Sequence, residues 1–231
     1  MHNDFITQLM DWKPYYSSRT VRIVNSLLKR LEFETRLESP GCSGSMTNTE
    51  QRMNLFHLVS QVLAYDVPGD LVELGAHIGQ TGVLFGKVME AYAPERRLHV
   101  YDVFKNLAVE DDLRKNFTSV GLRIPEIHAG WIEDTVPDLL PREICFANID
   151  VGSRICPDLQ ALVLYCLKHV YPRLPKGGIC VLQDYCDPPI LSSLNPWPAI
   201  KAASDEFFRD KPEDVSVLYA DYYSHGFVRK Q

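Results

Sequence analysis

Residues 70–82, Asp-Leu-Val-Glu-Leu-Gly-Ala-His-Ile-Gly-Gln-Thr-Gly, decide the fold of this chain. An apolar run that carries Glu73 ends in a turn punctuated by Gly75, Gly79 and Gly82, and a helical pattern follows. In a parallel α/β sheet, such glycines let the backbone approach a ligand, and the next helix presents its N-terminus to that ligand. The stretch therefore predicts a nucleotide-sized crevice at the end of the first strand.

The spacing of the glycines distinguishes between ligands. Dinucleotide sites use Gly-x-Gly-x-x-Gly around a pyrophosphate, whereas this chain has Gly-x-x-x-Gly-x-x-Gly with an acid two residues ahead. Glu73 would repel a pyrophosphate but suits a cationic ligand such as S-adenosylmethionine (SAM). A nicotinamide oxidoreductase stays an alternative that the spacing disfavours, and a test for an NAD-dependent fluorescence change separates the two.

Length and composition predict one α/β domain with an N-terminal extension. The chain has 231 residues, 45% of them hydrophobic, and we divide it into a helical extension or lid at 1–45 and a SAM-binding domain at 46–231. The net charge of −6 and the lack of a basic run disfavour a nucleic-acid partner. The six cysteines form no CxxC pair, which favours buried, reduced thiols. Since no signal peptide and no apolar stretch of ~18 residues is present, we expect a cytoplasmic protein without a membrane partner.

Strand and helix patterns alternate along the chain from Leu71 onward. Expected strands are Leu71–Leu74, Leu98–Val103, Glu126–Ala129, Ile144–Ile149, Ile179–Leu182, Ser216–Tyr222 and Gly226–Arg229, and helices fall near 83–91, 110–120, 158–171 and 198–209. The last two strands can form only a hairpin, so one strand runs antiparallel. We therefore predict a doubly wound, mostly parallel sheet of about seven strands.

Two helical segments precede the first strand. Residues 1–38 have helical periodicity, and the Ser-, Gly- and Pro-containing stretch 39–45 forms a break. A helix then begins near Glu50, with Thr47 or Thr49 as its cap.

Acidic residues lie at the end of several expected strands, namely Glu73, Asp102, Asp150 and Asp184. Ligands bind outside the carboxyl ends of such strands. Asp102 can accept both hydroxyls of a ribose, although it can equally cap a loop. Trp131 follows the third strand and lies either against a purine or in the core.

The ends of the fourth and fifth strands bring together Asp150, Gln183 and Asp184. Oxygen ligands of this kind suit Mg²⁺ or Ca²⁺ rather than zinc, and such a metal would activate a substrate hydroxyl. Without a metal, Asp150 or Asp184 can accept the hydroxyl proton directly, and Asp184 can instead cap the following loop. His77 lies near the expected position of a methionine carboxylate, while His128 and His225 are candidate bases or ordinary turn histidines.

Five motifs occur in order: Met46-Thr-Asn-Thr-Glu-Gln-Arg52, Gly69-Asp-Leu-Val-Glu-Leu-Gly75, Gly130-Trp-Ile-Glu-Asp-Thr-Val-Pro137, Tyr171-Pro-Arg-Leu-Pro-Lys-Gly-Gly178 and Gln183-Asp-Tyr185. Together they resemble the macrocin O-methyltransferase family, SAM-dependent enzymes of the class I fold that methylate hydroxyls of sugars and related natural products. The resemblance covers about residues 46–186.

The resemblance implies SAM contacts, N-terminal helices that fold over the active site, and a homodimer. Residues expected to contact the cofactor are Met46, Thr47, Glu73, Gly75, Ala76, His77, Gly79, Asp102, Trp131 and Asp150. Asp150 and Asp184 are the expected catalytic residues.

The chain departs from the family at the metal-binding acids. Family members have Asp-Gly-Asp-x-Tyr after the fourth strand and Asp-Asp-Tyr after the fifth, which hold Mg²⁺. Here Gly152 replaces the second acid and Gln183 replaces one of the paired acids. We therefore expect weakened metal binding, and an alternative is a SAM-binding cyclase or scaffold that has lost methyl transfer.

Overall fold

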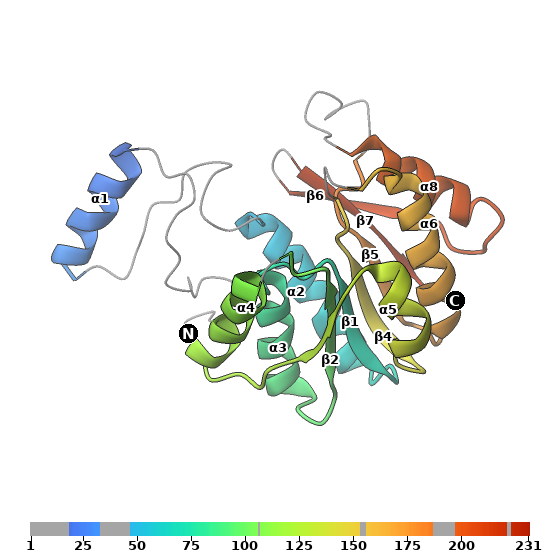
Figure 1. Ribbon diagram of the computed structural model, residues 1–231, viewed down its shortest axis with the longest axis horizontal. Helices are drawn as coiled ribbons and strands as arrows, with labels where there is room; N and C mark the ends of the chain where they lie inside the picture. The colour runs from blue at the N-terminus through green and yellow to red at the C-terminus, as the bar shows by residue number, and fades with distance from the viewer. Residues whose placement is uncertain (1–18, 33–46, 106, 153–155, 187–196, 221–222) are drawn as a thin grey trace.

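The computed structural model describes residues 19–32, 47–105, 107–152, 156–186, 197–220 and 223–231 (Figure 1). In these ranges seven strands form one sheet in the order β3-β2-β1-β4-β5-β7-β6. The strands are β1 (Asp70–Leu74), β2 (Leu98–Asp102), β3 (Glu126–Ala129), β4 (Ile144–Ile149), β5 (Ile179–Leu182), β6 (Ser216–Ala220) and β7 (Tyr223–Arg229). β7 pairs antiparallel with both β5 and β6, and the other pairs are parallel. The predicted doubly wound sheet with one antiparallel strand is confirmed.

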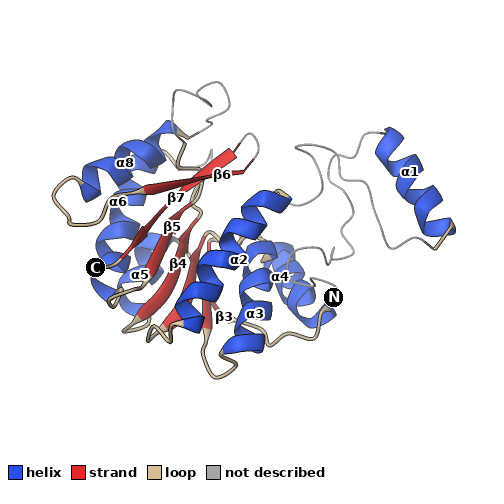
Figure 2. Cartoon of the chain, turned by 180° about the vertical axis from the view of Figure 1, so that it is seen from behind, coloured by secondary structure: helices blue, strands red, loops and turns tan. Residues whose placement is uncertain are grey.

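Helices cover both faces of the sheet (Figure 2). The helices are α1 (Arg19–Arg30), α2 (Thr49–Ala64), α3 (Gln80–Tyr92), α4 (Leu107–Ser119), α5 (Ile132–Leu139), α6 (Leu159–Val170), the short 3₁₀ turn η1 (Tyr171–Arg173) and α8 (Pro198–Phe208). One hydrophobic cluster joins α2, α3 and α4 to the sheet, and a second joins α5, α6 and α8 to its other face. This three-layer arrangement places the carboxyl ends of the parallel strands along one edge.

The central strands are hydrophobic along their whole length because both of their faces are covered. All six residues of β4 are buried, and successive side chains enter opposite layers. Phe146 packs edge-on against Phe85 of α3 with ring centroids 5.1 Å apart, while Ala147 belongs to the cluster on the α6 side. The expected bounds of β3, β4 and β5 match the observed ones.

The N-terminus of α2 differs from the prediction that Thr47 or Thr49 caps it. The cap is Asn48, whose side chain accepts the backbone N–H of Gln51 at 2.7 Å, while the Gln51 side chain accepts the Asn48 N–H at 2.9 Å. This reciprocal capping box satisfies two backbone donors at once. The Asn48 amide also donates to the Ala220 carbonyl at 2.9 Å, so the cap ties α2 to the end of β6.

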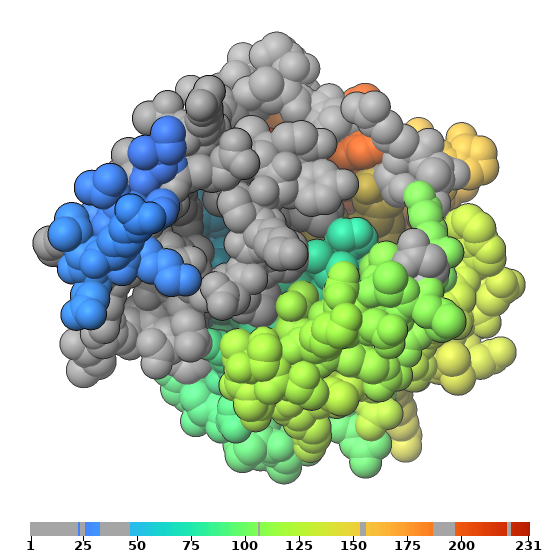
Figure 3. Space-filling model, turned by 60° about the vertical axis from the view of Figure 1, so that its left-hand side comes forward, coloured from blue at the N-terminus to red at the C-terminus, as the bar shows by residue number. Residues whose placement is uncertain are grey.

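The helix α1 lies apart from the helices that pack on the sheet, and Figure 3 shows it in blue at one side of the surface. The expected contact residue Met46 and the expected break at 39–45 lie outside the described residues. The division at residue 45 stays a prediction. No helix among the described residues is long and apolar enough to cross a membrane.

A buried histidine should make the stability depend on pH. His225 on β7 has no exposed surface, and burial lowers the pKa of its imidazole to about 4. Because this is below the ordinary value, the stabilisation is complete above about pH 6.5 and is lost as the pH falls toward 4, by about 3 kcal/mol in total. Urea unfolding at both ends of this range should show that wild type loses about 3 kcal/mol more stability than His225→Phe.

The exposed His57 on α2 supplies the control. His57→Gln should keep the wild-type loss of stability between pH 6.5 and 4. An equal slope for His225→Phe and wild type would contradict the assignment.

Candidate active site

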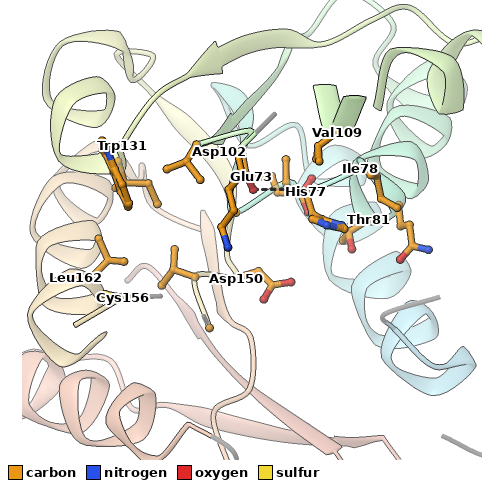
Figure 4. Close-up of a pocket in the computed structure, with 18 of the residues that line it drawn as sticks. Glu73, His77, Ile78, Thr81, Asp102, Val109, Trp131, Asp150, Cys156 and Leu162 are labelled. Atoms are coloured by element: carbon orange, nitrogen blue, oxygen red, sulfur yellow. Dashed lines mark hydrogen bonds between the residues drawn. The ribbon is translucent and has the colours of Figure 1, made fainter. Parts of the chain in front are cut away.

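A cavity of about 420 Å³ opens at the carboxyl ends of β1, β2 and β4 (Figure 4). β1 lies between β2 and β4, so the order of the strands reverses at β1. Doubly wound sheets bind ligands at such a switch point. Described lining residues include Thr47, Glu73, Gly75, Ala76, His77, Thr81, Asp102, Lys105, Val109, Trp131, Glu133, Asp150, Gly152, Cys156 and Leu162.

The turn after β1 approaches β4 more closely than any side chain would permit. A Cβ atom on Gly75 would lie 1.9 Å from the carbonyl oxygen of Asp150, and Gly75 has a φ of +93°. The Gly75 N–H donates to the Tyr101 carbonyl at 2.8 Å, and the Asp150 N–H donates to the Leu74 carbonyl at 2.8 Å. Glycine is required here both by the close approach and by the left-handed backbone.

The same turn leads into α3 without a side-chain cap. Gly79 is the N-cap residue with φ +77°, and no side chain bonds the first helical turn. A Cβ on Gly82 would lie 2.9 Å from Glu73 Oε2, so this glycine leaves room for the Glu73 carboxyl. The uncapped positive end of the helix dipole therefore faces a cavity where an anionic group such as a carboxylate can bind.

Asp102 at the end of β2 holds the loop in place. One of its oxygens accepts the His77 N–H at 2.8 Å, and the other accepts the Phe104 N–H at 2.9 Å. The loop-capping interpretation of Asp102 is thus correct. Each carboxylate oxygen keeps a second lone pair, and the residue lines the cavity, so the capping role leaves ribose binding open.

Glu73 is buried, with 1% of its surface exposed. One of its oxygens accepts the Asn148 amide N–H at 3.3 Å, while Oε2 has no partner. Burial raises the pKa of the carboxyl well above its usual range, and the nearby charges of Asp150 and Asp102 raise it further. Because an unpaired buried oxygen is costly, a cationic ligand nearby would be stabilised here.

Asp150 and Asp184 repel one another at the ends of β4 and β5. Burial raises the pKa of both carboxyls, and for Asp150 the charges of Asp184 and Asp102 add to the effect. Asp150 reaches the cavity, but protein surrounds its remaining sides, so the charged form is poorly solvated. A carboxylate with a raised pKa is a better proton acceptor than one in water.

Trp131 stands at the mouth of the cavity. It is the N-cap residue of α5 and exposes 56% of its surface, so the interpretation as a core tryptophan is wrong. Its flat side chain faces the cavity opposite the ends of β1 and β4 (Figure 4). The expected contact with a purine stays a prediction.

Of the three candidate histidines, one lines the cavity and two do not. His77 lines the cavity. His128 instead stacks on Tyr101 at 4.4 Å between ring centroids and contacts the ring of His99, and His225 on β7 has no exposed surface. Neither His128 nor His225 is among the residues that line the cavity.

Several lining residues were not predicted from the sequence, among them Lys105, Glu133 and Cys156. Lys105 follows the end of β2 and Glu133 lies in the first turn of α5, so their position after strand ends was the available signal. Among the described lining residues, four carboxyl groups (Glu73, Asp102, Glu133 and Asp150) accompany one lysine. The cavity is therefore acidic.

The donor set at the ends of β4 and β5 does not fit a Mg²⁺ ion, which requires near-octahedral oxygen ligands. The described residues contain no group of three His, Cys, Asp or Glu side chains that could hold a metal. Of the three expected ligands, Asp150 lines the cavity, whereas Gln183 is buried and Asp184 is not among the lining residues.

This fold and site define a class I SAM-dependent methyltransferase. The sheet has the class I strand order, and an acidic cavity opens beside the glycine turn at its switch point. Comparisons with known proteins indicate which methyltransferases of this class the chain resembles.

The profile of the family described as "Macrocin-O-methyltransferase (TylF)" matches residues 8–113. The chain is 24% identical over 202 residues to mycinamicin III 3''-O-methyltransferase of Micromonospora griseorubida, covering 75% of this chain and 77% of that protein. It is 27% identical over 173 residues to a Streptomyces olivaceus enzyme, 8-demethyl-8-(2,3-dimethoxy-α-L-rhamnosyl)-tetracenomycin-C 4'-O-methyltransferase, covering 63% and 64%.

Solved structures with the same fold include the O-methyltransferase NovP, with a TM-score of 0.65 and 22% identity over 81% of this chain and 82% of that one. CalS11, a TDP-rhamnose 3'-O-methyltransferase, gives 0.59 and 20% over 93% and 96%. TomG of Streptomyces achromogenes, solved with SAM, gives 0.60 and 8% over 94% and 91%. The chain is similar to the macrocin O-methyltransferase family over residues 8–113, and it is an O-methyltransferase that uses SAM.

Removing the Asp102 carboxyl should weaken SAM binding. Asp102→Ala loses both the acceptor for the loop N–H groups and the proposed acceptor for the ribose hydroxyls. Since hydrogen bonds to charged groups contribute about 1.5–3 kcal/mol, we expect affinity to fall about 10- to 100-fold in isothermal titration with SAM. Asp111→Ala, which removes an exposed acid of α4 outside the cavity, should leave the affinity unchanged. Equal affinities for both variants would contradict the assignment.

Proposed function

We propose that this enzyme methylates a hydroxyl on the sugar of a small glycosylated natural product. One relative is named for a rhamnosyl substrate and one structural neighbour for TDP-rhamnose, which supports a deoxysugar acceptor. The observation that carries the proposal is the acidic cavity at the β1 switch point, with Asp102 and Asp150 on the strands that flank β1. A sulfonium ligand is cationic and is attracted to such a site.

We propose the following roles for the residues that line the adenosyl side. Asp102 accepts the ribose hydroxyls, and Trp131 lies against the adenine, where a flat aromatic surface stacks well. The N-terminus of α3, with His77 beside it, binds the methionine carboxylate. Thr47, two residues before α2, contacts the cofactor from the cavity wall, since it is 6% exposed and lines the cavity.

The reaction requires a proton acceptor on the acceptor side. SAM supplies an electrophilic methyl group on sulfur, and the bond to sulfur breaks as the bond to the acceptor oxygen forms. Asp150 accepts the proton from that hydroxyl, since burial raises its pKa, and then releases it to solvent. Asp184 keeps Asp150 basic through like-charge repulsion. Asp150 also orients the hydroxyl in line with the methyl group, and positioning of this kind supplies much of the rate.

Asp150→Asn tests the proton acceptor because asparagine has nearly the same shape but cannot take a proton. In assays with labelled SAM and a panel of rhamnosides and other glycosides, we expect kcat to fall about 100-fold or more. SAM affinity should change far less than kcat. Glu133→Gln, which neutralises another lining carboxyl, is the control and should keep most of the activity.

Two results would contradict the proposal. One is an Asp150→Asn variant that retains the wild-type kcat. The other is wild-type protein that binds SAM but labels no glycoside in the panel, which would favour the SAM-binding scaffold.

We also propose that the enzyme is a homodimer joined through α1. Ile23 and Leu27 of α1 and Leu31, the residue after its end, recur every four residues along one side, and they expose 56%, 56% and 60% of their surface. Light scattering should give about twice the monomer mass of 26.4 kDa. Leu27→Glu should yield monomer, whereas Leu107→Glu, at a position of α4 that is 81% exposed, should leave the dimer intact. A monomeric wild type would overturn this proposal.

A further inference from the structure

Gly152 and Trp197 meet beside the carboxyl group of Asp184. Gly152 lies two residues after Asp150 and lines the cavity, and Trp197 is the N-cap residue of α8. A Cβ atom on Gly152 would lie 3.0 Å from Trp197 Nε1, 3.1 Å from Trp197 Cδ1 and 3.2 Å from Asp184 Oδ2. The edge of the indole and the carboxylate therefore occupy the space that a side chain at position 152 would need.

A divalent cation at this place would require a third oxygen ligand. Asp150 and Asp184 supply two carboxylates, and a side chain at position 152 would lie next to Asp184, since a Cβ atom there would be 3.2 Å from Asp184 Oδ2. At position 152 even a methyl group would be in close contact with the indole, so an aspartate could be accommodated only if Trp197 moved. Trp197 is half-buried and packs against the cluster of α6 and α8, which limits such movement.

Gln183 does not replace the missing ligand. Its side chain is 2% exposed, its Oε1 has no partner, and it is not among the residues that line the cavity. It directly follows Leu182, the last residue of β5, and its backbone N–H donates to the Ile149 carbonyl of β4 at 3.0 Å. An amide also lacks the charge that favours a divalent cation over water.

We propose that the acceptor side of this site works without a divalent cation, because Trp197 occupies the space beside Asp184 that a third oxygen ligand would need. In this arrangement Trp197 is a positioning residue. The indole N–H is a donor without acceptor capacity, so the edge that borders Asp184 favours a carboxylate there and disfavours a metal ion. The inference extends the proposed methyl transfer, in which Asp150 acts directly on the hydroxyl and Asp184 keeps Asp150 basic.

Metal binding can be measured without any acceptor, which separates this inference from the proposed function. Mn²⁺ titration followed by electron paramagnetic resonance should detect no saturable site in wild type at submillimolar Mn²⁺. Gly152→Asp combined with Trp197→Ala restores a third carboxylate and removes the indole, and it should bind Mn²⁺ at least tenfold more tightly than wild type. Gly152→Asp alone should gain less, because the indole stays in place.

Trp197→Ala alone is the matched control and should gain no Mn²⁺ site, since it adds no ligand. SAM binding, measured by isothermal titration for every variant, shows whether the fold is retained. If the double variant with Gly152→Asp does not fold, the double variant Gly152→Asn with Trp197→Ala supplies an uncharged replacement. That replacement should bind Mn²⁺ more weakly than the double variant with Gly152→Asp but more tightly than wild type.

Three results would overturn the inference. One is a wild-type protein with a stoichiometric Mn²⁺ or Mg²⁺ site. Another is a set of folded double variants that bind Mn²⁺ no better than wild type, which would show that Trp197 is not what excludes the cation. The third is methyl transfer that stops in EDTA and returns with Mg²⁺, whereas full activity in EDTA is the expected outcome.

Discussion

The close packing of two backbone segments at the ends of β1 and β4 underlies the rest of the structure. Gly75 lies so near the Asp150 carbonyl that a Cβ atom would be 1.9 Å from it. Hydrogen bonds from Gly75 to β2 and from Asp150 to β1 hold the strand ends in register. Because these contacts are made by the main chain, they fix where the following side chains begin. The cavity, the start of α3 and the position of Asp150 all depend on this one approach.

The second constraint is the cost of gathering carboxyl groups in a partly enclosed space. Glu73, Asp150 and Asp184 all have raised pKa values, with burial as the main cause. Such an arrangement opposes folding unless it is compensated, and it is retained where binding or catalysis requires it. A cationic cosubstrate relieves the repulsion on the adenosyl side. On the acceptor side the same repulsion raises the proton affinity of Asp150, which is the property that the proposed proton transfer requires.

The consequence of having Gly152 in place of an acid depends on the tertiary structure. From the sequence it is a lost ligand, and it weakens the expectation of a metal. The structure adds that the freed space is occupied by Trp197, which comes from the start of α8 more than forty residues later. An empty space beside Gly152 could be filled by water or a cation. The space that Trp197 occupies cannot.

The sequence by itself determined the layers, the bounds of the central strands and the acids at the strand ends, because hydrophobic runs and turn glycines act locally, whereas β7 begins at Tyr223 rather than at the expected Gly226. The match of β3, β4 and β5 to their expected bounds reflects this. Only the tertiary structure decided which polar groups form hydrogen bonds with one another, since several residues near each other in the sequence could form the same bond. Asn48 rather than a threonine caps α2, and its side chain also donates to the Ala220 carbonyl. The exposure of Trp131 and the contact of Trp197 with Gly152 depend likewise on packing between distant segments, which a local pattern cannot encode.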